Sequence, residues 1–567
     1  MSERKKREFM KNKVIKQLMI CIATGVLLAG CNISGTEQSE SASSQETVAE
    51  ATQTTENSTP ESTEEKNQAE TETDASTESK TDEKDDGLSV KGDAKAQSLS
   101  QDPEFLIYSF PDWVYDESDM SDPIMKISYP TLSIGNDTSS GQVLSKVVKQ
   151  TADQCKAQAD EFRKSFESMA KDEFKGANWE NDSYVYGSNG YARRIDSRVF
   201  SMLEEVYSYA NGAHGNTYFN AYNYDLTTGN EIKLDDVVKD KTALFEAVKK
   251  NLWEKYDTNI FYSEETLKLA LHDLIDGDMS DYLVFTIEAD GVSFWFNDTS
   301  ISAFLDGCQV ATIPFKGNES IFNEAYISGQ DDYVKEVVPG MLCQIASGHT
   351  VEIAQYGSAD SSNTDFIPAI RYDGKEKVLE NVYCSDLRAY LVHKSGKDYL
   401  YCQTEEDSED HYLRIFTLGG EQLGDFRSPE KFGALNATLV DPNNFEMFTR
   451  VDALATMFPI ANYSVGEEGM PVAKDSYYTL PDSIWNFTLL KDLTADVAAD
   501  KNADSYTSEI LPAGTQMTII RTNAENWVDL ELKDGRVVRL TFDFSAYPHV
   551  INGINEDELF DGIFYCD

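Results

Sequence analysis

Apolar residues that recur at three- and four-residue steps predict helices in the first half of the folded chain. The longest run lies on one face of a single helix and comprises Leu144, Val148, Ala152, Cys155, Ala159, Phe162, Phe166 and Met169. Residues 242–256 and 263–274 predict two further helices, with Ser263 as the N-cap of the second. Residues 178–190 are polar and contain glycine, so they predict a break before the next element.

Alternating apolar and polar positions predict a β-hairpin after this break. Its first strand covers residues 198–209. One face of its returning strand carries Tyr218, Tyr222, Tyr224 and Leu226. Asn211-Gly212 and Thr228-Gly229 flank that strand and tolerate positive φ angles. The pattern therefore predicts a hairpin with a polar loop at its tip.

Short strands separated by turn residues replace the helical pattern from about residue 345. Residues 387–393 and 399–403 flank a turn at Ser395-Gly396. Residues 412–418 meet two glycines and are expected to return through residues 422–426. This succession of short strands and turns predicts an antiparallel β domain. A propeller is a weaker alternative, because no internal repeat is found.

The last part of the chain predicts a small barrel. Residues 511–519 lead into a strand at 527–532, which turns at Asp534-Gly535 into a strand at 537–542. A two-residue loop at this turn sets Leu532 opposite Val537 and Leu530 opposite Arg539. The segment resembles small bacterial barrels of the SH3 type, which are often associated with cell-wall binding.

Together these patterns predict an α+β fold. Helices on an antiparallel sheet fill the N-terminal half, followed by a β-rich domain and a small C-terminal SH3-like β-barrel. The expected folded regions are an N-terminal α+β subdomain, an α+β module, the β-rich domain and the barrel with its tail. Their boundaries are 102–185, 186–340, 341–480 and 481–567.

The N-terminus predicts secretion and lipid anchoring. Several Lys and Arg residues precede an apolar run from Leu18 to Leu28, which is too short to span a bilayer as a helix. The run ends in Leu28-Ala29-Gly30-Cys31, which resembles a bacterial lipobox. Residues 1–30 are therefore expected to be a signal peptide and Cys31 the lipidated anchor on the extracytoplasmic face of the bacterial cell membrane. A plain secretory signal with a chance cysteine is the alternative.

Residues 31–101 predict a disordered, acidic linker. They are mostly Ser, Thr, Glu, Asp and Gln with almost no large apolar side chain. Such a segment buries too little surface to offset the entropy of ordering. We expect the linker to act as a spacer between the anchor and the folded part.

The charge of the chain constrains its partners. The whole sequence carries 49 Lys+Arg and 99 Asp+Glu, and residues 1–30 hold seven and two of these, which leaves 42 − 97 = −55. Nucleic acid and anionic membrane surfaces are repelled by such a chain, whereas basic proteins are attracted to it. Solubility alone is an equally good explanation of the acidity.

The cysteines leave disulfide formation open. Of eight, Cys21 falls in the signal and Cys31 is the expected anchor, so six remain and permit three disulfides. The hairpin register places Cys402 opposite about Tyr390, so we do not pair it with Cys384. Cys155 lies on an apolar helix face and is expected to be a small buried side chain. No Cys or His spacing predicts a zinc site.

The hairpin carries a resemblance to a known family. Residues 207–234 contain a Gly-Ala-His turn, an Asn-rich strand, a Thr-Gly turn and a Leu-Asp pair. They resemble a module shared by the RsiV family of lysozyme-sensing anti-sigma factors and by PdaC-type peptidoglycan deacetylases. Residues 282–296 and 310–315 look like its closing strands, and residues 127–132 look like part of its companion domain. The resemblance covers about residues 120–320 and implies an extracytoplasmic α+β module.

A search for catalytic motifs favours a protein that is not an enzyme. Residues 540–545 read Leu-Thr-Phe-Asp-Phe-Ser, which lacks the second Asp and the Gly of the deacetylase metal motif. No His-x-x-x-His pair and no Gly-x-Ser-x-Gly elbow is present. Residues 273–281 lack the ligand spacing of a calcium loop. We therefore expect no catalytic residues, no metal site and no cofactor.

The candidate binding loop is the tip of the hairpin, because loops on rigid strands often carry recognition residues. His214 has two interpretations: it hydrogen-bonds a sugar or a partner's carboxylate, or it ties the turn together through backbone carbonyls, which we favour. The candidate binding residues are Tyr209, Asn211, Gly212, Ala213, His214, Gly215, Asn216 and Thr217.

Two functions follow from these observations. The first is a non-catalytic binding module that recognises a cationic wall hydrolase, with lysozyme as the example that the resemblance implies. The alternative is a cell-wall structural or assembly lipoprotein that binds peptidoglycan through its C-terminal domains. Control of a sigma factor is improbable, because the sequence has only a short basic start before the signal.

Overall fold

The structure is a computed structural model. It describes residues 105–565, with gaps at 136–140, 176–182, 329, 358–365, 407–409, 425–427, 429–432, 481–482, 484, 504, 544 and 546. The predicted signal peptide, linker and lipidated Cys31 lie outside these residues, and so does Cys566. No helix in the described ranges has the length and apolar character needed to cross a membrane.

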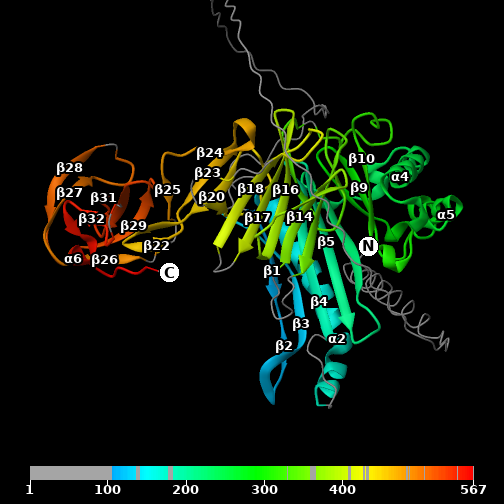
Figure 1. The fold of residues 1–567 in the computed structure, drawn as a ribbon, viewed down its shortest axis with the longest axis horizontal. Helices are drawn as coiled ribbons and strands as arrows, with labels where there is room; N and C mark the ends of the chain where they lie inside the picture. Colours follow the sequence, from blue (N-terminus) through cyan, green and yellow to red (C-terminus); the bar gives the residue numbers. More distant parts are fainter. Residues whose placement is uncertain are drawn as a thin grey trace, which may run out of the picture. The chain divides into compact units, whose positions relative to one another are not determined.

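A seven-stranded sheet forms the first part of the fold (Figure 1). Its strand order is β1-β3-β4-β5-β6-β7, and β2 pairs with β3. The strands are β1 (Phe105–Pro111), β2 (Val114–Asp116), β3 (Asp119–Ile134), β4 (Tyr184–Ile195), β5 (Val199–Ala210), β6 (Asn216–Asp225) and β7 (Asn230–Glu231). β3 and β4 run parallel while the other pairs run antiparallel, so the predicted antiparallel sheet is wrong at this position.

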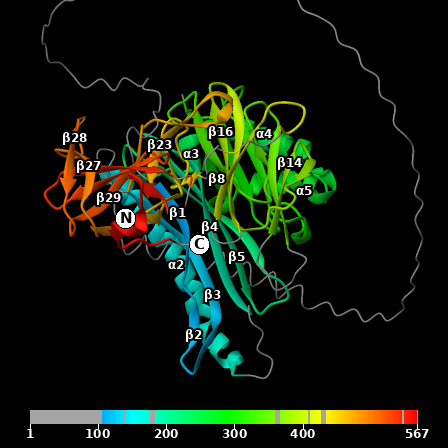
Figure 2. The same ribbon diagram turned by 60° about the vertical axis from the view of Figure 1, so that its left-hand side comes forward.

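The helix α2 (Gly141–Phe174) connects the two parallel strands and lies along the sheet (Figure 2). A parallel pair needs such a crossover, because a tight turn can join only antiparallel strands. Leu144, Cys155 and Phe162 of α2 are buried against the sheet, as the three- and four-residue pattern predicts. The predicted break at 178–190 is too long, because β4 begins at Tyr184.

Helices and a three-stranded sheet form the next part. The sheet comprises β8 (Val284–Ile287), β9 (Gly291–Phe296) and β10 (Gln309–Pro314), and the helices are α3 (Leu234–Val237), α4 (Lys241–Lys255) and α5 (Glu264–Asp276). Short 3-10 turns lie at η1 (Thr258–Phe261), η2 (Ser280–Tyr282) and η3 (Phe304–Asp306). Ser263 caps α5 as predicted, since its hydroxyl accepts a hydrogen bond from the Thr266 amide at 3.1 Å.

An eight-stranded antiparallel sheet follows. Its strands are β11 (Tyr333–Val337), β12 (Cys343–Gln344), β13 (Thr350–Gly357), β14 (Phe366–Tyr372), β15 (Lys375–Val378), β16 (Cys384–Lys394), β17 (Lys397–Glu406) and β18 (Asp410–Thr417). β11 pairs with β16, so a strand that precedes residue 340 joins this sheet. The expected return strand at 422–426 is wrong in its described part, because residues 421–424 form a bend and coil.

The cysteines of the described residues carry no disulfide. None of Cys155, Cys308, Cys343, Cys384 and Cys402 is joined in a disulfide. Cys402 lies opposite Ala389, one residue from the predicted Tyr390, and Cys384 lies opposite Glu406. The prediction that Cys384 and Cys402 do not pair is therefore confirmed.

The C-terminal strands form an open sheet, apart from β21 and β22, which pair with each other in a separate two-stranded sheet. The first group comprises β19 (Gly433–Leu435), β20 (Phe445–Thr449), β21 (Val451–Ala453), β22 (Ala455–Met457), β23 (Ile460–Val465), β24 (Pro471–Ala473), β25 (Tyr478–Thr479) and, between β23 and β24, the turn η5 (Glu467–Gly469). The second comprises β26 (Asn486–Leu489), β27 (Leu493–Ala498), β28 (Tyr506–Leu511), β29 (Gln516–Thr522), β30 (Trp527–Leu532), β31 (Val537–Asp543), β32 (Val550–Ile551), β33 (Ile554–Asn555), α6 (Glu556–Leu559) and β34 (Phe560–Asp561).

The predicted SH3-like barrel is not closed within the described residues. The main path of the sheet runs β25-β29-β30-β31-β27-β28 and ends at β28, while β26 pairs with β29 and β34. The turn after β30 is also longer than predicted. Val537 lies opposite Glu531 instead of Leu532, because the Leu532 amide bonds to the Arg536 carbonyl and shifts the register by one residue.

Candidate functional site

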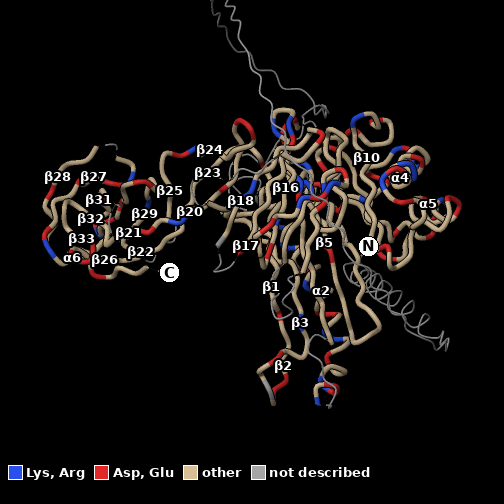
Figure 3. Tube along the Cα trace, viewed as in Figure 1, with Lys and Arg blue, Asp and Glu red and all other residues tan. Residues whose placement is uncertain are grey.

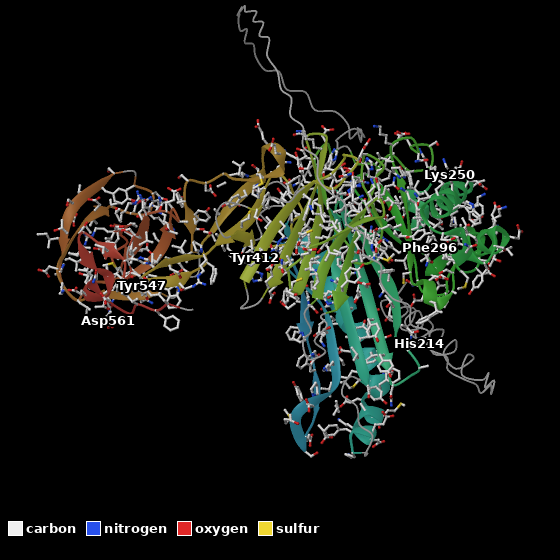
Figure 4. All side chains as sticks on the ribbon, in the orientation of Figure 1. His214, Lys250, Phe296, Tyr412, Tyr547 and Asp561 are labelled. Atoms are coloured by element: carbon white, nitrogen blue, oxygen red, sulfur yellow. The ribbon has the colours of Figure 1, made fainter. Side chains whose placement is uncertain are left out.

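The tip of the β5–β6 hairpin is the candidate binding site (Figure 4). The two strands stay paired up to Ser208 and Asn216, and residues 211–215 form the loop between them. Asn211 has a φ of 51°, in the positive region that its residue type tolerates. The side chains of residues 211–214 are exposed, Ala213 among them.

Three hydrogen bonds hold the loop in shape. The Tyr209 hydroxyl donates to the Gly212 carbonyl at 3.1 Å. The Asn211 amide group donates to Glu173 Oε2 at 2.8 Å, which joins the loop to the last turn of α2. His214 Nδ1 lies 3.0 Å from the Gly215 carbonyl. This backbone contact is the one that the structural interpretation of His214 expects.

Gly215 allows an aromatic ring to approach the loop closely. A Cβ atom added at Gly215 would lie 2.4 Å from the ring of Tyr207. Tyr207 faces this glycine from β5, and 46% of its surface remains exposed. A glycine at this position therefore lets a half-exposed tyrosine lie against the loop.

The turn η3 completes the surface from a distant part of the chain. The Phe304 ring lies over the His214 ring, with centroids 4.0 Å apart and planes inclined by 34°. The next residue, Leu305, has 94% of its surface exposed. Leu305 therefore adds exposed apolar area close to the hairpin loop.

Two side chains after β9 bind the backbone of β6 and fix η3 near the loop. Asp298 Oδ2 accepts a hydrogen bond from the Thr217 amide at 3.1 Å, and Asn297 Oδ1 accepts one from the Phe219 amide at 2.7 Å. The Cys308 thiol donates to Asp298 Oδ1 at 3.4 Å. The two segments are therefore tied together by polar contacts as well as by the ring pair.

The electrostatics of these groups do not favour nucleophilic chemistry. Burial raises the pKa of the Cys308 thiol, and the neighbouring Asp298 carboxylate raises it further. Burial also raises the pKa of Asp298, although hydrogen bonds from Thr217 and Cys308 oppose the shift. A thiol held in its protonated form is a poor nucleophile. Among the described residues, no group of three His, Cys, Asp or Glu is arranged to hold a metal ion.

We call the resulting patch the tip surface, and it has two parts. The hairpin part was predicted from the sequence, whereas Tyr207, Phe304 and Leu305 were missed. Tyr207 precedes the predicted loop, and nothing in the sequence marks the contact between residues ninety positions apart. The tip surface comprises Tyr207, Tyr209, residues 211–217, Phe304 and Leu305.

A second notable group of side chains is a buried cluster of charges, which we call the ionic junction. It joins β4, the β8–β9 turn, β11 and β16 and comprises Arg193, Glu288, Asp290, Lys335, Glu336 and Arg388. Arg193 donates to Glu288 through Nε at 3.1 Å and through a second nitrogen. Lys335 Nζ lies 3.0 Å from Glu288 Oε2 and 2.9 Å from Asp290 Oδ2.

The ionic junction has the character of a structural element. Burial alone would raise the pKa of Glu288, but Arg193 and Lys335 outweigh it and lower the pKa to about 2. These two cations satisfy the carboxylate together with the Ser293 hydroxyl at 2.7 Å. A largely buried cluster of ion pairs of this kind holds neighbouring strands together.

Comparison with solved structures finds partial matches. No known protein-family profile matches the sequence, and no curated protein matches it. A crystal structure of a DUF3298-family member from Bacteroides fragilis is 18% identical, with a TM-score of 0.30, and the match covers 41% of this chain and 96% of that one. A DUF3298-family protein from Pseudomonas aeruginosa is 14% identical with a TM-score of 0.26, over 41% of this chain and 100% of that one.

The DUF3298 domain is the one associated with the RsiV and PdaC proteins that the hairpin resembles. The matched part amounts to about two fifths of this chain.

Proposed function

We propose that this protein is a lipid-anchored extracytoplasmic binding protein without catalytic activity. Cys31 carries the anchor, and the tip surface recognises a cationic, wall-directed protein, with a C-type lysozyme as the example. The observation that carries the proposal is the tip surface itself. It combines the exposed Leu305 of η3 and the half-exposed Tyr207 of β5 with a hairpin loop that is held by its own hydrogen bonds.

The shape of the tip surface supports insertion into a cleft. Leu305 and Tyr207 supply apolar area that water leaves on binding, and tyrosine side chains serve well as anchors. The hydrogen bonds of Tyr209 and Asn211 fix the loop before any partner arrives. A loop that is already ordered loses little conformational entropy on binding.

Charge supports a basic partner. Acidic residues are distributed over the whole described chain (Figure 3), and the complete sequence has a formal net charge of −50. Glu173, Asp298 and Asp306 lie beside the tip surface, and residues 207–217 contain no Lys or Arg. Such a field raises the association rate of a cationic protein and weakens with added salt.

The alternative function has an observation of its own. In the C-terminal part, 72% of Tyr547 and 54% of Phe564 are exposed. The Tyr547 ring stands edge-on against Tyr565 at 5.7 Å, and Phe564 stacks on Trp485 at 5.8 Å. Exposed aromatic rings can pack on the apolar faces of sugars, so peptidoglycan binding by this part remains the second candidate.

The test is a calorimetric titration of the chain from residue 32 onward with lysozyme at physiological salt. An equally basic, unrelated protein serves as the control for attraction by charge alone. We expect saturable heat with lysozyme only. Equal binding of both proteins, or no binding, contradicts the proposal and directs attention to binding of purified peptidoglycan by the C-terminal part.

A pair of leucine variants locates the contact. Leu305→Ala is expected to weaken lysozyme binding about tenfold, because it removes a central apolar anchor. Leu269→Ala on α5 is the matched control, since Leu269 is 62% exposed and lies outside the tip surface. Equal affinities of the two variants would place the contact elsewhere.

A pair of glycine variants tests the geometry of the loop. Gly215→Ala must displace the Tyr207 ring, because the new Cβ would lie 2.4 Å from it. Gly212→Ala places its Cβ 3.8 Å from the nearest atom and needs no movement. We expect weaker binding only for Gly215→Ala, with little change in unfolding free energy because the exposed ring can turn away.

A further inference from the structure

The contact between α2 and the sheet is unusually polar in its middle. Glutamines of α2 reach tyrosine hydroxyls on β6: Gln150 donates to Tyr224 at 3.1 Å, Tyr224 donates to Gln154 at 2.9 Å, and Gln158 donates to Tyr222 at 2.8 Å. Helices usually bury an apolar stripe on a sheet. This helix therefore depends on specific hydrogen bonds where it crosses β6.

Glu204 of β5 lies at the centre of this contact. Its side chain is completely buried, with 0% of the residue exposed. Four side chains donate hydrogen bonds to its carboxylate, and all four are uncharged. They are Ser188 at 2.9 Å, Tyr222 at 2.6 Å, Gln158 at 3.2 Å and Asn220 at 3.2 Å.

The groups that face Glu204 from the packed elements carry no compensating positive charge. β4 contributes Ser188 and Tyr186, β6 contributes Tyr218, Asn220 and Tyr222, and α2 contributes Cys155 and Gln158. Burial raises the pKa values of Tyr186, Tyr222 and Cys155, and all three are neutral at physiological pH. Burial likewise raises the pKa of Glu204, although its hydrogen bonds oppose the shift.

The site accommodates both protonation states of Glu204. The ionised carboxylate has four donors within hydrogen-bond distance. The protonated form can donate its own proton to the hydroxyl oxygen of Ser188 or Tyr222, since hydroxyl groups both donate and accept. A proton can therefore bind or leave while the surrounding side chains keep their places.

The same helix is connected to the hairpin tip. The C-terminal half of α2 packs Phe162 and Phe166 against Tyr184 and Tyr186 of β4. In the last turn of α2, Glu173 accepts the hydrogen bond from Asn211 of the loop. A change in the position of α2 on the sheet would therefore affect the hydrogen bond that holds the hairpin tip.

We propose that Glu204 is a proton-binding latch that docks α2 on the sheet more firmly as the surroundings become acidic. The direction follows from linkage. The docked state holds the proton more tightly than an opened state, where Glu204 has its ordinary pKa of 4.5. The extra stability is complete below that value, is lost as pH rises toward the pKa of the docked state, and is constant above it. This inference does not depend on any binding partner.

The experiment is hydrogen exchange of the α2 backbone amides as a function of pH in the chain from residue 32 onward. We expect protection factors in the wild-type protein to fall by up to tenfold per pH unit above about pH 4.5 and then level off, as one released proton requires. Glu204→Gln keeps the size of the side chain and cannot titrate, so its α2 protection should stay constant over the same range.

Asp153→Asn is the matched control, because it removes a carboxylate of α2 whose side chain is 66% exposed. It should show the wild-type pH dependence. The proposal is overturned if wild type and Glu204→Gln have parallel profiles. Should Glu204→Gln fail to fold, carbon-13 NMR of the Glu204 carboxyl group in the wild-type protein decides the question: a titration midpoint at or below 4.5 rejects the latch.

Discussion

Glu288 and Glu204 are both completely buried, yet their surroundings shift their pKa values in opposite directions. Glu288 lies between Arg193 and Lys335, which lower its pKa to about 2. Glu204 has four uncharged donors, and burial raises its pKa despite them. Neutral hydrogen bonds partly replace lost hydration, whereas two close cations more than replace it.

Glu336 is an intermediate case, in which burial and a neighbouring cation act on the pKa in opposite directions. It is buried, pairs with Arg388 at 2.6 Å and accepts the Ala192 amide hydrogen bond at 2.9 Å. Burial raises its pKa, and the attraction to Arg388 reduces the shift without reversing it. The direct ion pair with Arg388, with a smaller contribution from Arg193, is therefore too weak to reverse the effect of burial. Glu288 stays charged because two cations pair with it directly.

The largest expected effect is that of Glu288→Ala. This variant leaves Arg193 buried beside a cavity without its carboxylate and leaves Lys335 with Asp290 alone. Breaking a buried ion pair in this way typically destabilises a protein by ~3–5 kcal/mol. Chemical denaturation followed by circular dichroism measures the loss. Asp290→Ala is the control, since Asp290 is only partly buried and Lys335 keeps Glu288 as its partner. A loss below ~1 kcal/mol would show that the junction is not a closed ionic cluster.

Acid titration of the wild-type protein should reveal the second largest effect. Because the folded pKa of Glu288 is lowered, its contribution to stability is present above the ordinary value of 4.5 and is lost as pH falls toward about 2. Thermal melting between pH 5 and pH 2 is the measurement. Glu288→Gln should lack this component, and an unchanged acid dependence in that variant contradicts the assignment.

Local patterns account for the elements that were predicted correctly. The spacing of Leu144 and Phe162 identifies α2, and Ser263 identifies the start of α5, because both signals lie within the element itself. The positive φ of Asn211 is equally local. The parallel pairing of β3 with β4 was missed because it depends on where the chain returns after α2.

The residues of the tip surface and the ionic junction likewise divide into those that local sequence predicts and those that it does not. The hairpin loop could be predicted from its own residues. The contact that brings Phe304 and Leu305 to it has no signal in the sequence near either segment. Arg193 and Lys335 lie in strands whose polar positions would ordinarily face water. Their burial arises only when three sheets meet. The predicted register between β30 and β31 was wrong for a more local reason. One extra residue in the loop changes every pairing that follows.

Tyr222→Phe sharpens the comparison at the Glu204 site. The change removes the 2.6 Å hydrogen bond to the carboxylate and the acceptor of the Gln158 amide, while the ring remains. We expect a loss of ~1–3 kcal/mol at neutral pH, since a buried acceptor loses a donor. The loss should shrink in acid, where Glu204 holds its proton. Tyr224→Phe, farther along β6, removes a hydroxyl from the same helix contact and should show no such pH dependence.

Arg388→Lys should have the smallest effect and tests whether the number of cations is the deciding quantity. Lysine keeps the single positive charge beside Glu336 but loses the planar fork that also reaches the carbonyls of Ile107 and Gly190, each at 3.3 Å. We expect a loss of roughly 1 kcal/mol from those weaker bonds. Denaturant unfolding beside Glu288→Ala gives the comparison. If Arg388→Lys is as damaging as Glu288→Ala, the geometry of the donors matters more than the count of charges. The three carboxylates would then differ in how their partners are arranged, and Glu204 would owe its raised pKa to poor donor alignment as much as to the lack of a cation.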